Sequence, residues 1–342
     1  MRNLARAATA ERAAYLNETA DRRRVPVWMV EKDFWVCWLL GRLFTMEAFK
    51  GHLVFKGGTS LSKVFGVIHR FSEDIDLSIS PALLGIDEAW LEEAVKKSQR
   101  VKRMEKLETV CIQAVHERYA PLLEKTIRDE LGAPENLWKL TSSVDAVTHS
   151  PVVLFEYPHV AAYGDYVPPV VKIEFGSLTD QQPVGEHTVR PMIADEFPEV
   201  LTIPEVAVVA MEAERTFWEK ATILHDASLR PADKPFRDRS CRHYYDTVLL
   251  AENVAGERAL ARLDLLERVT RFKSLFFMSS WSDYTSAKPG SFRLVPPHAR
   301  RTEVETDYAK MQEFFIVQPP SFDELWQRLQ AAEARINAVG RS

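Results

Sequence analysis

The sequence predicts an α/β protein of the α+β type, in which helices precede a small mixed sheet and a helical part follows it. Three observations lead to this fold class. Residues 75–79 alternate with a period of two, as a strand does. Residues 53–55 and 170–175 are short runs rich in β-branched and aromatic side chains, which is also typical of strands. From residue 205 onward, the spacing of apolar residues is mostly helical.

The length and composition indicate a globular protein of more than one part. A chain of 342 residues suggests two domains, or one large core with a helical appendage. We expect N-terminal helices over 1–50, a core over 51–204 and a helical C-terminal domain over 205–342. The formal net charge of −5 argues against a generally basic protein that coats nucleic acid, although it permits a local basic patch.

Cysteine usage and hydropathy indicate the compartment. The chain has three cysteines, Cys37, Cys111 and Cys241, which are far apart and lack metal-ligand spacing. They are typical of reduced thiols and not of a disulfide framework. The first residues lead into mixed charge instead of an apolar signal segment, and no apolar run approaches the roughly 18 residues of a membrane span. We expect a soluble, cytoplasmic protein without a membrane partner.

The N-terminal elements follow from helix propensity and from a proline. Residues 1–24 are rich in Ala, Arg and Glu, which favour helix. Pro26 breaks that run and suits the first turn of a new helix. Apolar residues then recur at helical spacing over 27–49: Val30, Phe34, Leu39 and Leu43. A short buried strand is predicted at 53–55, followed by a helix at 60–65.

The remaining elements follow from periodicity and from breakers. Residues 87–131 form a long, charged, amphipathic region, which we interpret as two helices. Strands are predicted at 152–157, at 170–175 and near 200–203, ahead of Pro204. Helices are then predicted at 211–225, 237–252, 256–275, 301–317 and 321–339. Residues 279–298 are rich in Ser, Pro and Gly, so a loop is expected there.

The most informative segment joins a glycine turn to two carboxylates. Gly57 and Gly58 precede a hydroxyl pair and open a short helix, and Asp74 and Asp76 follow at i and i+2. In a strand, residues i and i+2 point to the same face, so both carboxylates would lie beside the turn. Two such charges need a cation between them, and Mg²⁺ is the natural candidate. The amides of a glycine turn suit phosphate. The segment therefore predicts nucleotidyl transfer.

Glu174 is the best candidate for a third carboxylate, which would complete a metal site or accept the proton of an attacking hydroxyl. It lies in a predicted strand, with Lys172 two residues before it on the same face. The alternative is that Lys172 and Glu174 form the solvated face of an edge strand.

Two predicted helices carry further candidates. On the first, Phe217, Ala221 and Leu224 share a buried face, and Lys220 could bind phosphate as a compact cation. The alternative is that Glu219 and Lys220 are ordinary exposed charges. The second helix carries side chains three or four residues apart that could grip a triphosphate or an RNA end: Arg239, Arg242, His243 and Asp246. The alternative there is a simple Arg242–Asp246 ion pair.

Residues 96–103 form a basic run, KKSQRVKR. Such a run is usually a solvated helix face, although it could also contact the phosphates of a long nucleic acid. The tryptophans are expected to serve the core more than to stack on bases: Trp28, Trp35, Trp38 and Trp218.

The run from Phe55 to Ile79 closely resembles the AbiEii/AbiGii-type nucleotidyltransferases, the toxin halves of abortive-infection and type IV toxin–antitoxin pairs. Four further motifs follow the order of that family: Glu31-Lys32-Asp33-Phe34-Trp35, Lys172-Ile173-Glu174, Phe217-Trp218-Glu219-Lys220 and Arg242-His243-Tyr244-Tyr245-Asp246. The resemblance covers most of residues 26–252. Many relatives carry a basic or acidic residue where this chain has His243, which leaves the role of that position open.

The resemblance implies a polymerase-β-like nucleotidyltransferase core that uses an NTP. It implies Mg²⁺ held by Asp74 and Asp76, and triphosphate contact by Lys220. Related toxins add nucleotides to the acceptor end of tRNA, which blocks aminoacylation and halts translation. A tRNA or other RNA acceptor and a cognate antitoxin are therefore the expected partners.

The site residues assigned from the sequence fall into three sets. The catalytic set is Asp74, Asp76, Glu174, Lys220 and Asp246. The metal set is Asp74, Asp76 and Glu174. The nucleotide-binding set is Gly57, Gly58, Thr59, Ser60, Lys63 and Arg242.

Two other functions stay open. One is a nucleotidyltransferase that modifies a small hydroxyl or amine compound, or a protein. For a small substrate, the acceptor pocket should be compact and acidic. A toxin that acts on tRNA should instead have a long, positively charged groove. The other is a non-catalytic regulator that binds nucleotide, which the intact Asp74/Asp76 pair disfavours.

Overall fold

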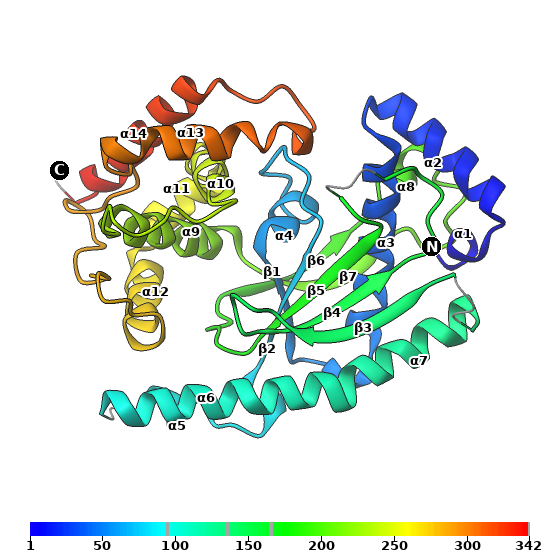
Figure 1. Cartoon of the computed structure of the whole chain (residues 1–342), viewed down its shortest axis with the longest axis horizontal. Coiled ribbons are helices and arrows are strands. Elements are labelled where there is room, and N and C mark those ends of the chain that lie inside the picture. The colour runs from blue at the N-terminus through cyan, green and yellow to red at the C-terminus, as the bar shows by residue number, and fades with distance from the viewer. Residues whose placement is uncertain (94–95, 134–136, 164–166, 341–342) are drawn as a thin grey trace. The chain divides into compact units, whose positions relative to one another are not determined.

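The computed structural model describes residues 1–93, 96–133, 137–163 and 167–340 (Figure 1). The chain forms two compact units. The first unit comprises Met1–Val64 and Ser72–Ala210, and the second comprises Phe65–Phe71 and Met211–Ser342. The chain therefore enters the second unit briefly, returns to the first, and leaves it again after Ala210.

Within the described residues, the first unit contains a seven-stranded mixed sheet, in the order β3-β4-β5-β2-β1-β7-β6. The strands are β1 Leu53–Lys56, β2 Ile75–Ile79, β3 Lys139–Val144, β4 Pro151–Glu156, β5 Val170–Gly176, β6 Val184–Val189 and β7 Val206–Met211. β2 pairs with β5 in parallel and with β1 in antiparallel orientation. β1 is parallel to β7, and β4 is antiparallel to both β3 and β5. The predicted fold class, with its mixed sheet, is confirmed.

One predicted strand is wrong. Residues 200–203 form no strand, and β7 begins at Val206, after Pro204. The apolar pattern that suggested the strand has another cause, because Leu201 is buried while Ile203 is 69% exposed. Three strands were not predicted: β7, which lies where the pattern suggested helix, and the two edge strands β3 and β6. β3 and β6 lie at the two edges of the sheet, and most of their side chains are exposed or half-buried, so they lack an apolar pattern.

The first unit also contains helices before and between the strands. They are α1 Arg2–Arg6, α2 Thr9–Arg23, α3 Val27–Thr45, α4 Gly57–Lys63, α5 Glu88–Glu92, α6 Lys97–Ala114, α7 Ala120–Leu131 and α8 Ile193–Glu196. A π-helical turn, Val115–Tyr119, joins α6 to α7. Pro121 is the second residue of α7, and it can neither donate a helical hydrogen bond nor pack against a regular preceding turn.

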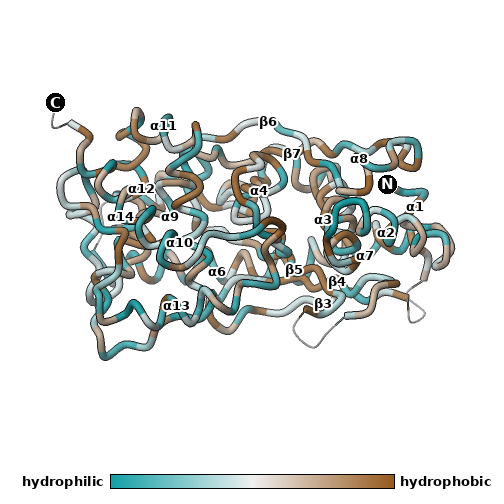
Figure 2. The backbone as a smooth tube through the Cα atoms, turned by 90° about the horizontal axis from the view of Figure 1, so that it is seen from above, coloured by the Kyte–Doolittle hydropathy of each residue, from teal (hydrophilic) through white to brown (hydrophobic). Residues whose placement is uncertain are grey.

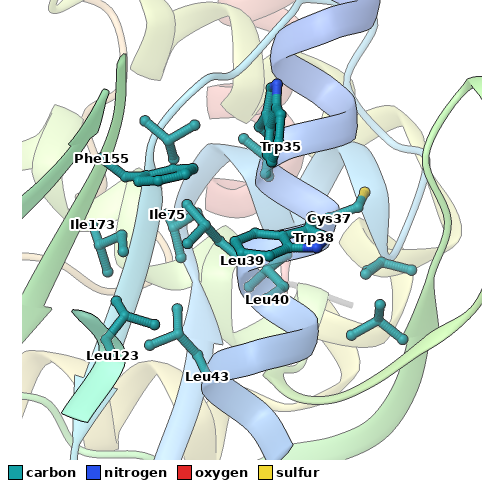
Figure 3. Packing of buried hydrophobic residues seen from close by; sticks show 14 of the residues in the cluster. Trp35, Cys37, Trp38, Leu39, Leu40, Leu43, Ile75, Leu123, Phe155 and Ile173 are labelled. Carbon is teal, nitrogen blue, oxygen red and sulfur yellow. The ribbon is translucent and has the colours of Figure 1, made fainter. Parts of the chain in front are cut away.

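The core of the first unit lies between α3 and one face of the sheet (Figure 3). Trp35 and Trp38 are fully buried, and their rings lie 5.8 and 5.9 Å from that of Phe155 in β4. Ile75 and Ile173 complete this face from neighbouring strands. Hydrophobic residues accordingly concentrate along α3 and the central strands (Figure 2). Because strand side chains alternate, the polar residues of β2 and β5 point to the opposite face.

The second unit is helical, as predicted. Its helices are α9 Ala213–Leu229, α10 Cys241–Glu252, α11 Val254–Ala261, α12 Leu263–Phe276, α13 Arg301–Ala309 and α14 Phe322–Ala338. The single helix expected over 256–275 is interrupted at Arg262, which leaves α-helical geometry with φ −121°. Residues 277–297 contain neither helix nor strand, which confirms the predicted loop. Trp218 is fully buried and serves this unit's core.

All three cysteines are free and buried. Burial raises the pKa of Cys37 to about 12 and that of Cys111 to about 11, so both thiols are protonated and inert at neutral pH. Across the described part of the chain, none of the helices is long and apolar enough to cross a membrane.

Candidate active site

The polar face of the sheet carries a row of charged side chains from three neighbouring strands. Asp76 in β2 is the register partner of Glu174 in the parallel strand β5. On its other side, Asp76 is the partner of Lys56 at the end of β1. Register partners share a face and lie about 5 Å apart. The structure therefore brings Asp76 and Glu174 together, although 97 residues separate them in the sequence.

The glycine turn lies against this row. Gly57 has φ +78°, a conformation that side chains rarely adopt. A Cβ atom at Gly57 would lie 2.0 Å from Oδ2 of Asp76 and 2.9 Å from its Cβ. Two independent reasons therefore require glycine at this position: the positive φ angle, and the short distance to Asp76. The turn and the carboxylate adjoin each other, as their spacing in the sequence suggested.

The two hydroxyls of the turn bond within the protein. Thr59 Oγ1 donates to the backbone oxygen of Asp74 at 2.5 Å and lies 3.0 Å from Oγ of Ser72. Ser60 Oγ donates to the backbone oxygen of Gly57 at 3.1 Å. Both hydroxyl residues are buried. Thr59 thus ties the turn to the segment that carries Asp74, which lies just before β2, while Ser60 bonds within the turn itself.

Lys63 ends the helix that the turn opens. Its ammonium lies 2.6 Å from Oδ1 of Asp33 in α3. Burial disfavours the charge, but Asp33 outweighs this and raises the pKa of Lys63. The sequence placed Lys63 among the nucleotide ligands, whereas in the structure Asp33 holds its ammonium.

Glu174 has a lysine partner on its own strand. Lys172 Nζ lies 3.0 Å from Oε2 of Glu174 and 2.8 Å from Oδ2 of Asp145. Burial lowers the pKa of Lys172, but the two carboxylates outweigh this and raise it. The alternative that these residues lie on an edge strand is wrong, because β5 is an interior strand between β4 and β2.

The carboxylate row suits a hard cation in its chemistry. Asp76 and Glu174 offer the oxygen ligands that Mg²⁺ prefers, and Asp74 lies two residues before Asp76. The Oδ2 atom of Asp76 lies 2.0 Å from where a Cβ atom at Gly57 would stand, so this carboxylate packs directly against the backbone of the turn. As the described residues stand, no three or more His, Cys, Asp and Glu side chains gather closely enough to hold a metal. The Lys172 ammonium occupies one side of Glu174 instead.

The second unit holds a separate buried cluster around Asp246 of α10. Arg70 grips this carboxylate with two hydrogen bonds of 2.8 Å, and Lys220 Nζ lies 2.9 Å from its Oδ2. Burial alone would raise the pKa of Asp246, but the two cations outweigh it and hold the pKa well below its usual range. Burial, with Arg70 and Arg242 nearby, lowers the pKa of Lys220 despite Asp246.

Sequence reasoning identified part of this cluster. Lys220 is buried beside Asp246, so the alternative of ordinary exposed charges on α9 is wrong. Its neighbour Glu219 is also engaged, 2.8 Å from Arg215 and 3.2 Å from Lys273. Arg70 was missed. It lies in the short excursion into the second unit, with no periodic pattern around it, and its partner is 176 residues away.

The start of α10 differs from the prediction. The helix begins at Cys241, and Arg239 lies before it with φ +58°, so Arg239 does not share the helical face of Asp246. Asp307 accepts the amides of Arg239 and Cys241 at 2.8 and 2.7 Å. His243 is on the helix, and its Nδ1 is buried without a hydrogen-bond partner among the described residues. Burial, Lys220 and Arg242 together lower the pKa of His243 well below 6.5.

The basic run is a largely solvated helix face. Lys96, Lys97 and Lys102 are exposed near the start of α6. Arg103 bonds to Glu93 at 2.8 Å, and its guanidinium lies over the ring of Trp90. Nothing in these contacts distinguishes the run from an ordinary helix surface.

Comparisons with known proteins bear on this arrangement. The family model described as "Nucleotidyl transferase AbiEii toxin, Type IV TA system" matches residues 38–328. Among solved structures, the chain is similar to MenT4, a nucleotidyltransferase toxin from Mycobacterium tuberculosis H37Rv. The two chains share 16% sequence identity with a TM-score of 0.46, and the alignment covers 94% of this chain and 98% of that one. No curated protein matches the sequence.

Proposed function

Because this chain belongs to the AbiEii family of nucleotidyl transferase toxins of type IV toxin–antitoxin systems, we propose that it transfers NMP from an NTP to the 3′ end of tRNA. The protein is a nucleotidyltransferase, and its family implies an NTP substrate and a cognate antitoxin. The tRNA acceptor, and a consequent block of translation that would serve phage defence, are the parts that we add.

One observation supports the reaction above all others. Asp76 and Glu174 adjoin on parallel strands, and the Gly57 backbone approaches Asp76 with no side chain between them. Carboxylates beside a turn that offers backbone amides can serve a phosphate and its counter-cation together.

We assign roles to the residues of the sheet. Asp74 and Asp76 would hold Mg²⁺, and Glu174 would complete the metal site or accept the proton of the acceptor hydroxyl. Bound Mg²⁺ would neutralise charge on the phosphate oxygens. The amides at Gly57 and Gly58 bind phosphate, while the Thr59 and Ser60 hydroxyls keep the turn in place.

In the second unit, we assign phosphate contact to Lys220 and Arg242. Asp246 keeps Lys220 in a fixed position through the 2.9 Å ion pair. Arg70 and Lys220 both contact the Asp246 carboxylate, and Arg242 is close enough to Lys220 to lower its pKa. The cluster therefore carries excess positive charge suited to an anion.

The proposed reaction is a displacement at phosphorus. The oxygen of the acceptor hydroxyl bonds to the α-phosphorus, the bond from that phosphorus to the bridging oxygen breaks, and pyrophosphate leaves. The hydroxyl proton passes to Glu174 or to water. Lys172 stabilises the Glu174 carboxylate from 3.0 Å.

The test incubates the protein and Mg²⁺ with each labelled NTP, with and without total tRNA. Three proteins are compared: wild type, the Asp74→Ala/Asp76→Ala variant, and Asp233→Ala as a control at an exposed aspartate. Label on tRNA with wild type and the control, but not with the double variant, would support the proposal. Label on small molecules or on protein would identify a different acceptor. No transfer by wild type would favour a nucleotide-binding regulator and contradict the proposal.

A further inference from the structure

Helix α3 carries three consecutive buried charges. Glu31, Lys32 and Asp33 are 0%, 2% and 2% exposed. Buried charges are costly unless each one is paired and hydrogen-bonded. Each of these side chains has partners in a different segment of the first unit, and two of them reach the nucleotide motif.

Lys32 reaches the residue before the first motif aspartate. Its Nζ lies 2.7 Å from Oε2 of Glu73 and 3.2 Å from the backbone oxygen of Pro168. The Lys32 side chain is 3% exposed and that of Glu73 is 14% exposed, so water screens this ion pair little. Glu73 is covalently joined to Asp74, and its position constrains the Asp74 backbone.

Asp33 reaches the other half of the motif. Its Oδ1 accepts from Lys63 Nζ at 2.6 Å, and its Oδ2 accepts from the backbone N–H of Met192 at 2.6 Å. Lys63 is the last residue of α4, the helix that also carries Thr59. Thr59 in turn donates to the backbone oxygen of Asp74.

The two routes therefore converge on Asp74. The strand ladder fixes Asp76, which is paired on both sides, but β2 begins only at Ile75. Asp74 lies outside the ladder, and the chain just before Ser72 belongs to the second unit. The contacts that hold the segment before β2 in the first unit include the Lys32–Glu73 ion pair and the hydrogen bond from Thr59 to the backbone oxygen of Asp74.

We propose that Lys32 and Asp33 are positioning residues that fix Asp74 beside Asp76, Lys32 through Glu73, and Asp33 through Lys63 and Thr59. This inference rests on the proposed function, because it concerns the same carboxylates. Neither residue touches the reacting atoms. Their effect is to keep Asp74 where a divalent cation needs it.

The main test replaces Lys32 and measures metal binding directly. Mn²⁺ serves as the probe, with free Mn²⁺ measured by electron paramagnetic resonance in the presence of each NTP in turn. Lys32→Met leaves Glu73 without its buried cation, so the segment before Asp74 loosens. We expect Mn²⁺ affinity to fall about tenfold or more, as for other residues that orient metal ligands. We expect kcat for tRNA labelling to fall with it, while KM for tRNA stays unchanged.

The same helix offers a matched control. Arg42 in α3 pairs with Glu130 at 3.0 Å, and their side chains are 19% and 15% exposed. Arg42→Met removes a partly buried ion pair from this helix, away from the motif. It should lower the thermal midpoint but leave Mn²⁺ affinity and kcat at wild-type levels.

A second variant separates positioning from stability. Lys32→Met/Glu73→Gln removes both charges, and replacing a whole buried pair costs less stability than orphaning one partner. We expect the thermal midpoint to recover while Mn²⁺ affinity stays low. Asp33→Asn should weaken Mn²⁺ binding by the second route.

The outcomes are distinguishable. If folded Lys32→Met binds Mn²⁺ as tightly as wild type, or if Arg42→Met loses as much affinity, the positioning role is overturned. If wild type binds Mn²⁺ but transfers no nucleotide, the proposed function fails while the Mn²⁺ comparison still decides the positioning role. A wild-type protein that binds no Mn²⁺ with any NTP would overturn both.

Discussion

A Cβ atom placed on Gly57 would lie 2.0 Å from Oδ2 of Asp76, far inside van der Waals contact. The nearest obstacle is therefore a carboxylate that we assign to the metal site. Rotation of the carboxylate would not relieve the whole clash, because the Cβ atom of Asp76 also lies 2.9 Å from the added atom and belongs to a strand that is paired on both sides. The glycine and the aspartate thus form one structural unit, although 18 residues separate them in the sequence.

Gly57→Ala should abolish tRNA labelling, because the new methyl group displaces the Asp76 carboxylate. The matched control is Gly51→Ala, since Gly51 has a similar φ of +74° but nothing within 4 Å of its added Cβ. Both variants should lose about 1–2 kcal/mol of stability from backbone strain. Thermal melts and labelling assays on both proteins separate strain from steric clash. Equal activity in the two variants would refute the claim.

Glu174→Gln should lower kcat by about 100-fold or more, because an amide can neither neutralise a cation nor take up a proton. The control is Glu156→Gln on β4 of the same sheet, where the side chain is 47% exposed and pairs with Lys139. The two steady-state rates with tRNA and NTP give the comparison. A Glu174→Gln enzyme as fast as the control would remove Glu174 from the mechanism.

The Asp246 cluster predicts a specific acid sensitivity. The folded pKa of Asp246 lies below its ordinary 3.8, so its ion pairs contribute stability above pH 3.8, and this contribution is lost as pH falls toward the folded value. At about pH 7, Asp246→Asn should be less stable by about 3–5 kcal/mol, because Arg70 and Lys220 lose their buried counter-ion. Thermal midpoints should be measured for both proteins across pH, and the difference between the wild-type and variant midpoints should become smaller in acid. A gap that stays constant below pH 3.8 would contradict this linkage.

His243 predicts a second pH effect at milder acidity. Its folded pKa lies well below 6.5, because burial and the Lys220 and Arg242 cations oppose protonation. As pH falls below 6.5, the unfolded chain therefore binds a proton at His243 while the folded chain does not. The free energy of unfolding is then unaffected by His243 above pH 6.5 and declines as pH falls below it. His243→Gln should flatten this decline, as followed by thermal melts between about pH 7.5 and 5. The exposed His298→Gln controls for loss of a histidine as such.

The parts of the fold with strong local patterns were predictable. Strand β2 was expected at 75–79 and is found there, because its alternation reflects burial of Ile75 and Leu77 against α3. Strand β3, KLTSSV, gave no such signal, since only its pairing with β4 makes it a strand. Tertiary pairing of this kind cannot be inferred from one segment alone.

In the candidate site too, residues with a local sequence signal were predictable, and contacts between distant segments were not. Gly57 and Asp76 were identified because their chemistry and spacing are local. Arg70 was missed, since its pairing with Asp246 spans 176 positions of the sequence. For Lys63, residue type suggested a phosphate ligand, but the choice of partner depended on Asp33, 30 residues earlier on a different helix.

The chain crosses between its two units three times, because Phe65–Phe71 belongs to the second unit while the residues on either side belong to the first. A fragment that starts at Met211 therefore lacks Arg70, the residue that grips Asp246 with two bonds. No single cut can release the helical unit intact, and a recombination event at the boundary near Ala210 would split it.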